Sequence, residues 1–130
     1  MTDTPQRVSS NTPWERQVGY CRAIRVGSQI FVSGTTASDE EGNVVAAGSA
    51  YNQTVYILNK IESAMQSLGG ELSHVVRTRM FVTNIADWPE IGRAHAERFG
   101  EYPPAATMVE VDRLVHPEQL VEVEIDAVVT

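Results

Sequence analysis

Length, composition and charge exclude several classes of protein. The chain has 130 residues, of which 42% are hydrophobic and 21% charged, as expected for one globular domain with a sizeable core. Its formal net charge is −7, and its single lysine, Lys60, and nine arginines form no basic run. Non-specific nucleic-acid binding depends on clustered Lys and Arg, and a helix needs about 20 apolar residues to span a bilayer. Neither a nucleic acid nor a membrane is therefore an expected partner.

The first residues predict an arm ahead of the domain. Residues 1–13 are rich in Thr, Ser, Asn, Gln and Pro and show no periodicity. We expect a mobile or partner-bound arm over residues 1–17 and one domain over residues 18–130. The indole of Trp14 either closes the core of its own domain or packs on a neighbouring subunit. The amino terminus does not resemble a signal peptide and Cys21 is the only cysteine, which favours a cytoplasmic protein without an internal disulfide.

Two kinds of periodicity predict the elements of the domain. Apolar residues alternate with polar ones in the strands and recur at three- and four-residue steps in the helices. Ser49 is a suitable N-cap for the first helix, Gly69 a suitable stop, and Asp87 begins a capping box for the second. In chain order the expected elements are strands over residues 20–26 and 29–34, a short edge strand at 44–45, a helix over 51–68, a strand over 75–82, a helix over 88–99, and strands over 106–111 and 120–129.

This order predicts an α+β fold in which two helices cover one face of a single mixed sheet. Alternation assigns Val76 and Thr78 to the helix side, and Val109 to a core-like face of its strand. The other sheet face, here called the uncovered face, would carry charges of both signs, either solvated or paired across a subunit boundary. Its expected side chains are Tyr20, Arg22, Arg77, Arg79, Glu110, Glu122, Glu124 and Asp126.

Several kinds of chemistry lack their usual residue patterns. Ser33 precedes Gly34 without the elbow motif of a serine nucleophile. The three histidines are far apart and have no zinc-ligand spacing with Cys, Asp or Glu, and we expect His95 to be a hydrogen-bonded residue of the core or its boundary. Glycine-rich loops that bind phosphate are also absent. The sequence therefore predicts no metal site and no cofactor.

Four segments together resemble the RidA/YjgF family of small trimeric proteins, also called the endoribonuclease L-PSP family. They are Val32-Ser33-Gly34, Gln53-Thr54, Pro104-Ala105 and the run from Val121 to Ile125, and the resemblance covers residues 18 to 129. It implies a fold of the chorismate mutase-like type and a homotrimer with a barrel-like core. It also implies a small-molecule cleft at each subunit interface.

The resemblance also implies which residues form the cleft. Tyr20, Ser33 and Gly34 match binding positions, and Glu124 matches a glutamate that positions a water molecule for acid–base catalysis. For Glu124 a salt bridge with Arg22 or Arg79 is an equally open interpretation. At two further cleft positions this chain differs from the usual family members. Ala106 stands in place of an arginine that binds the substrate carboxylate, and Met108 stands in place of a frequent cysteine.

The family reaction is the hydrolysis of reactive enamines or imines to 2-oxo acids and ammonia. A methyl group cannot replace the paired hydrogen bonds of an arginine, so we expect Arg22 or Arg79 to bind the carboxylate in place of Ala106. One hypothesis is therefore a divergent enamine/imine hydrolase that acts on a small carboxylate. The alternative is a trimer that binds a metabolite without catalysis. The acidic composition argues against a third reading, an endoribonuclease.

Overall fold

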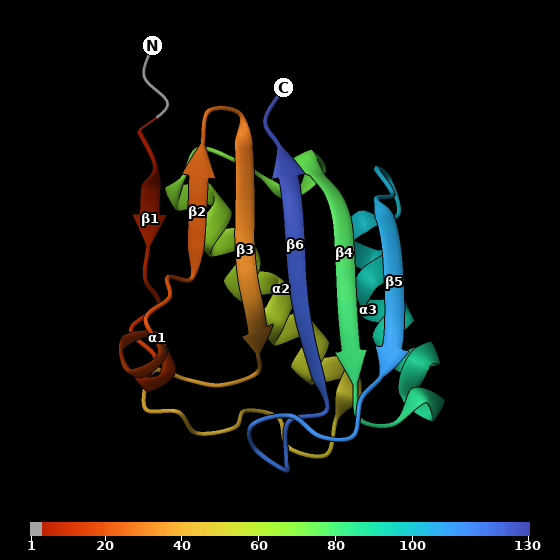
Figure 1. Ribbon diagram of the computed structural model, residues 1–130. Coiled ribbons are helices and arrows are strands. Elements are labelled where there is room, and N and C mark those ends of the chain that lie inside the picture. Colours follow the sequence, from red (N-terminus) through yellow and green to blue (C-terminus); the bar gives the residue numbers. More distant parts are fainter. Residues whose placement is uncertain (1–3) are drawn as a thin grey trace.

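A mixed six-stranded sheet, ordered β1-β2-β3-β6-β4-β5, is the frame of the molecule (Figure 1). The computed structural model describes residues 4–130, so residues 1–3 of the expected arm lie outside the described residues. The strands are β1 (Gln6–Val8), β2 (Ala23–Val26), β3 (Gln29–Thr36), β4 (Val75–Val82), β5 (Ala105–Glu110) and β6 (Val121–Val128). Neighbouring strands are antiparallel except β4 and β5, which are parallel. The predicted α+β class and single mixed sheet are confirmed.

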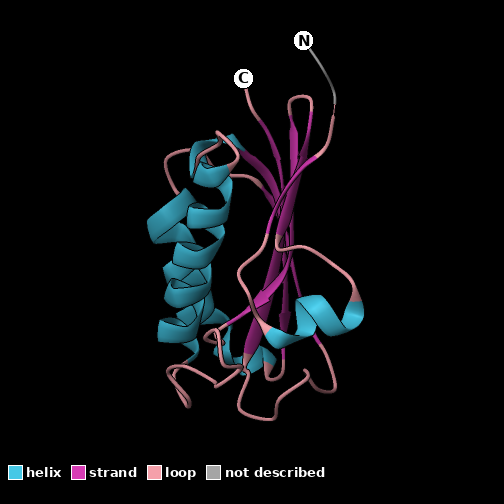
Figure 2. Cartoon of the chain, turned by 90° about the vertical axis from the view of Figure 1, so that its left-hand side faces the viewer, coloured by secondary structure: helices cyan, strands magenta, loops and turns pink. Residues whose placement is uncertain are grey.

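Helices lie on both faces of this sheet (Figure 2). The two predicted helices, α2 (Ala50–Ser67) and α3 (Trp88–Phe99), cover one face, and Ser49 caps α2 by accepting the backbone N–H of Asn52 at 3.1 Å. A third helix, α1 (Pro13–Val18), lies at one corner of the opposite face. Its six residues are too few to show a helical period, so the sequence did not predict it. Short 3₁₀ helices, η1 (Leu72–His74) and η2 (Ile85–Asp87), flank β4.

The segment expected to be an arm contains ordered structure beyond α1. Gln6–Val8 pairs with β2 as an edge strand. The connection from β1 to α1 is fixed by the carboxylate of Glu15, which accepts hydrogen bonds from the hydroxyls of Ser9 (2.9 Å), Thr12 (2.8 Å) and Ser10 and from the backbone N–H of Ser10. Burial raises the pKa of Glu15, but these hydrogen bonds outweigh it and lower the pKa to about 2.

The core lies between the sheet and the pair α2 and α3. In β6 the predicted alternation is confirmed, because every second residue from Val121 to Ala127 is buried and the intervening acidic residues are half-buried on the other face. His95 of α3 lies at the boundary of this core, with Nε2 2.9 Å from the Thr78 hydroxyl, as expected for a hydrogen-bonded histidine. Within residues 4–130, no helix combines the length and the apolar character that crossing a membrane would require.

Two predictions of strand faces need correction. In β4 the helix-side residue Thr78 is buried as predicted, but Val76 is not. A register shift between Val75 and Arg77 buries Val75 and leaves Val76 48% exposed, so Val76 does not face the helices. In β5 the faces are exchanged: Met108 pairs with the buried Met80 and packs against the core, whereas Val109 is 42% exposed. In β4 a bulge changes which residues face inward. In β5, which has one neighbouring strand, the inward face is set by the register of its pairing with β4, and alternation along the sequence does not reveal that register.

Three further expectations need correction. Glu110 pairs with the buried Val82 and accepts the backbone N–H of Ile85 at 2.9 Å, so it does not belong to the uncovered face. Residues 44–45 form no strand, because Val44 makes only an isolated bridge to Ser38. Trp14 is half-buried beside the 39–43 loop and is not part of the buried core. Its contact with a neighbouring subunit stays a prediction.

Candidate functional site

A pocket of about 340 Å³, here called the site pocket, lies where α1 meets β3 and β6. Its polar lining includes Tyr20, Arg22, Ser33, Gly34, Lys60 and Glu122. Its apolar lining includes Trp14, Val18 and Val115, and the two valines are 73% and 75% exposed. Of the predicted site residues, the fold therefore brings together Tyr20, Arg22, Ser33 and Gly34.

A bulge in β3 forms the floor of the site pocket. The pairing of β3 with β6 shifts register between Val32 and Thr35, so Ser33 and Gly34 lie outside the regular ladder. The Ser33 hydroxyl donates to the Cys21 carbonyl at 2.7 Å, and Arg22 Nη2 donates to the Gly34 carbonyl at 2.8 Å. Bulges often redirect side chains beside active sites, and this one fixes a hydroxyl and a guanidinium next to each other.

Glu122 packs directly against this bulge. A Cβ atom at position 34 would overlap the Glu122 carboxylate, so only glycine leaves room for it. Burial raises the pKa of the Glu122 carboxyl above its ordinary value; Arg22 opposes the rise and Glu124 adds to it. A carboxyl group whose pKa is raised by burial keeps its proton to a higher pH than an ordinary glutamate, which suits it to general acid–base catalysis.

One buried and one half-buried cation complete the site pocket. Arg22 is 4% exposed and its guanidinium lies 5.5 Å from the centre of the Tyr20 ring, while its buried Nε has no hydrogen-bond partner among residues 4–130. Lys60 Nζ donates to the Ser38 carbonyl at 3.2 Å, and its pKa is lowered by burial and by the charge of Arg22. Neither cation forms an ion pair with a carboxylate in the described part of the chain. Both charges are therefore available to an anion.

The other predicted site residues lie elsewhere in the single chain. Arg79 Nη1 lies 3.3 Å from Glu124 Oε2 and 3.2 Å from Asp126 Oδ2, which confirms the salt-bridge interpretation of Glu124. Ala106 is exposed on β5, an edge strand separated from β6 by β4, and Met108 packs against the core. None of these residues lines the site pocket of the single chain. Their functional roles stay predictions.

Sequence reasoning missed Lys60, and it chose Glu124 and not Glu122 as the catalytic candidate. Alternation places both glutamates on one face, and only the bulge in β3 decides which of them lies over Gly34. For Lys60 the available signal was a lone lysine within the helical pattern of 51–68, next to positions assigned to the core. The described residues contain no group of three or more His, Cys, Asp or Glu side chains able to hold a metal ion.

The fold and the site pocket define a small α+β protein of the RidA/YjgF type, and comparison with known proteins agrees. The chain belongs to the endoribonuclease L-PSP family, whose model matches residues 11–129. The crystal structure of Rv2704 from Mycobacterium tuberculosis, a member of the YjgF/YER057c/UK114 family, shares 42% identity and a TM-score of 0.87, and the match covers 97% of this chain and 100% of Rv2704.

Two curated proteins are similar over most of their length. The 3-aminoacrylate deaminase RutC of Acinetobacter baylyi is 36% identical over 104 residues, which are 80% of this chain and 82% of RutC. An uncharacterized protein of Streptomyces coelicolor is 32% identical over 127 residues, which are 97% of this chain and 93% of that protein. Of these two proteins, only RutC has a name that states an activity.

Proposed function

We propose that this protein is a deaminase that hydrolyses a small enamine or imine carrying a carboxylate. One observation carries the proposal: a half-buried carboxyl with a raised pKa, Glu122, lies against Gly34 in the same pocket as Arg22. The similarity to a 3-aminoacrylate deaminase supports this class of substrate. The overall charge of −7 remains an argument against an RNA substrate, despite the name of the family.

The chemistry needs one group that donates and then accepts a proton. Protonated Glu122 gives its proton to the enamine carbon, which forms an iminium ion. Water adds to the iminium carbon, and the Glu122 carboxylate removes a proton from this water. Collapse of the adduct releases ammonia and leaves a carbonyl compound, so that one water is consumed for each ammonia formed.

Substrate binding is assigned to the groups around Glu122. Arg22 and Lys60 bind the substrate carboxylate, which gives Arg22 the role predicted for a replacement of the arginine missing at Ala106. The Ser33 hydroxyl already donates to Cys21, so its oxygen is left to accept an N–H of the substrate. Arg79 is the weaker candidate, because two carboxylates already neutralise it.

Assembly into a homotrimer is part of the same proposal, as is a cytoplasmic location. The uncovered face exposes apolar side chains that a partner could bury, including Phe31 at 42% and Val109 at 42% exposure. An edge strand β5 from a neighbouring copy would bring Ala106 to the exposed rim of the site pocket, whereas Met108 packs against the core of its own chain. The cleft at an interface, inferred from the family resemblance, then consists of the site pocket and this second strand.

The test compares two neighbouring glutamates. Ammonia release from freshly generated 3-aminoacrylate or an imino acid is measured for the wild type, Glu122→Gln and Glu124→Gln. We expect Glu122→Gln to lower turnover by about 10²- to 10⁴-fold, the usual contribution of general acid–base catalysis. We expect Glu124→Gln to keep most of the activity. The reverse result would reject Glu122 and restore the assignment made to Glu124 from the sequence.

A metabolite-binding protein without turnover is the second candidate, and Ala106 is the residue that favours it. In that case 2-oxo acids would raise the Tm of the protein, because a ligand that binds only the folded state stabilises it. Neither the wild type nor the variants would then release ammonia faster than the uncatalysed reaction.

A further inference from the structure

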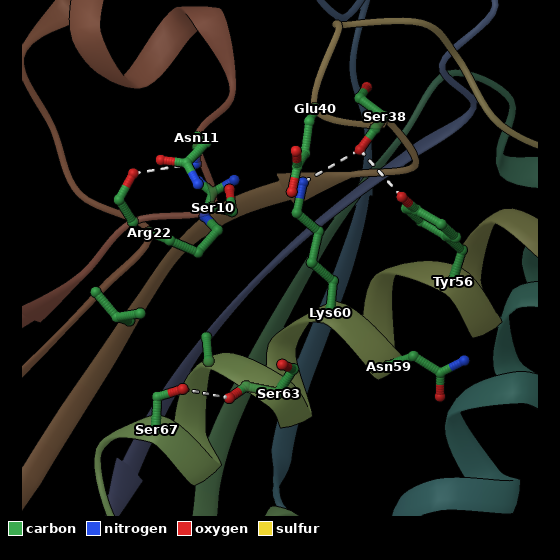
Figure 3. A pocket seen from close by; sticks show the side chains of 13 residues that line it. Ser10, Asn11, Arg22, Ser38, Glu40, Tyr56, Asn59, Lys60, Ser63 and Ser67 are labelled. Carbon is green, nitrogen blue, oxygen red and sulfur yellow. Dashed lines mark hydrogen bonds between the residues drawn. The ribbon is translucent and has the colours of Figure 1, made fainter.

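A second pocket, of about 510 Å³, lies on the other side of Arg22 and Lys60. We call it the arm pocket, because the connection from β1 to α1 forms one wall and α2 forms the other (Figure 3). Along α2 its lining residues follow one another at three- and four-residue steps, which makes a polar stripe beside the apolar one. The residues of this stripe are Tyr56, Asn59, Lys60, Ser63 and Ser67.

Arg22 and Lys60 line both pockets, so they separate the arm pocket from the site pocket. In Figure 3 Lys60 extends from α2 towards Ser38, and Arg22 reaches the pocket from the side of Ser10 and Asn11. The Nε of Arg22 is buried without a partner among the described residues, although buried donors are nearly always satisfied. An anion in the arm pocket would neutralise the buried charge of Arg22 and the half-buried charge of Lys60.

The remaining lining restricts the charge and the chemistry of the anion. Glu40 lies at the rim of the arm pocket and Glu15 acts on Lys60 from nearby, so a ligand with several negative charges would be repelled. On α2, Asn59 uses its Oδ1 to accept from Arg98 and keeps its NH₂ group free, and the Ser63 hydroxyl has no hydrogen bond within residues 4–130. These groups match hydroxyls on a ligand.

We propose that the arm pocket binds a small hydroxylated monocarboxylate, whose carboxylate lies between Arg22 and Lys60 and whose hydroxyls contact Asn59 and Ser63. This proposal does not require that the site pocket catalyses deamination, although the two pockets share Arg22 and Lys60. Because both pockets use the same two cations, ligands in the two pockets weaken each other's binding, and the effect is equal in both directions.

The test uses gluconate, glycerate and lactate as probes on the full chain. Amide NMR spectra are recorded during titration, with sorbitol as a neutral polyol of similar size to gluconate. We expect at least one hydroxy acid to shift the amides of residues 9–11 and 59–67, and sorbitol to shift them little. Lys60→Met and Ser63→Leu should each weaken this binding by about tenfold, the first through the loss of a charge-assisted hydrogen bond and the second through the loss of a hydroxyl contact and the bulk of the leucine side chain.

Val115→Ala is the matched control, because Val115 lines the site pocket alone and is 75% exposed. It should leave the titration unchanged, and thermal melting shows whether each variant is folded. Shifts confined to Gly34 and Glu122 and insensitive to Ser63→Leu would place the acids in the site pocket and overturn the proposal. Equal binding of sorbitol, or no binding by any of the three acids, would also overturn it. Ammonia release reports on the proposed deaminase independently of these results.

Discussion

Gly34 links the backbone of the bulge to the chemistry of Glu122. Its missing side chain is the space that the Glu122 carboxylate occupies. A methyl group at position 34 would contact the end of the Glu122 side chain, which can rotate away, and not the backbone. The fold should therefore tolerate a substitution that the catalytic geometry does not.

Gly34→Ala is expected to lower ammonia release by about 100-fold, since a displacement of about 1 Å at a reacting group has an effect of this size. Its Tm should change little. Gly92→Ala is the control, because the nearest atom to a Cβ at position 92, in Trp88, is 3.9 Å away and alanine favours a helix. Comparable activity in the two variants would show that Glu122 does not depend on its contact with Gly34.

The charged form of Glu122 should lower the stability of the folded protein, although the proposed reaction requires this residue. Its pKa is raised above 4.5 by burial, so the folded chain binds the proton more tightly than the unfolded chain and loses stability as pH rises through the folded pKa. We expect Glu122→Gln to raise the Tm at pH values above the raised pKa of Glu122, where the wild-type carboxyl is charged, and to leave it unchanged at about pH 3. An equal Tm at both pH values would mean that burial does not disfavour the charge.

At the scale of elements, α1 and the connection before it depend on one carboxylate. The hydroxyls of Ser9, Ser10 and Thr12 all donate to Glu15, which holds residues 9–15 as a closed turn between the two pockets. Both pockets use this turn as a wall, the arm pocket through Ser10 and the site pocket through Thr12. Loss of the carboxylate should loosen both walls together.

Glu15→Gln is expected to destabilise the protein by about 2 kcal/mol at neutral pH, the usual value of hydrogen bonds to a charged group. The pKa of Glu15 is lowered from 4.5 to about 2, so its contribution is present above pH 4.5 and disappears as the pH falls towards 2. Denaturant titrations of the wild type and the variant at several pH values should therefore converge in acid. A constant difference across this range would show that the charge is not responsible.

The elements also show what a sequence can and cannot predict. Long periodic segments such as α2 and β6 were predicted correctly, because each has one buried face of a single period. β5 was assigned the wrong inner face, since its orientation comes from its parallel pairing with β4 and not from its own residues. The candidate site follows the same rule: Ser33 and Gly34 were recognisable in the chain, whereas the choice between Glu122 and Glu124 depends on a bulge.

For the whole molecule, the proposed trimer should depend on the apolar part of the uncovered face. Phe31→Glu places a charge in the middle of this face, where Phe31 is 42% exposed and paired with Asp126, and should shift the mass measured by light scattering from trimer to monomer. Gln66→Glu, on the exposed side of α2, adds the same charge away from the sheet and should leave the mass unchanged. A wild-type monomer would refute the trimer outright.

The position of Lys60 gives the protein a built-in reporter. Lys60 is the single lysine of the chain and lies between the arm pocket and the site pocket. Protein labelled with ¹⁵N-lysine would therefore give one side-chain ammonium resonance. That amine also releases its proton at lower pH than an ordinary lysine, since burial lowers its pKa. A guest anion on either side should restore the affinity for the proton, and a shift of this single titration curve would register occupancy of both pockets without modifying the chain.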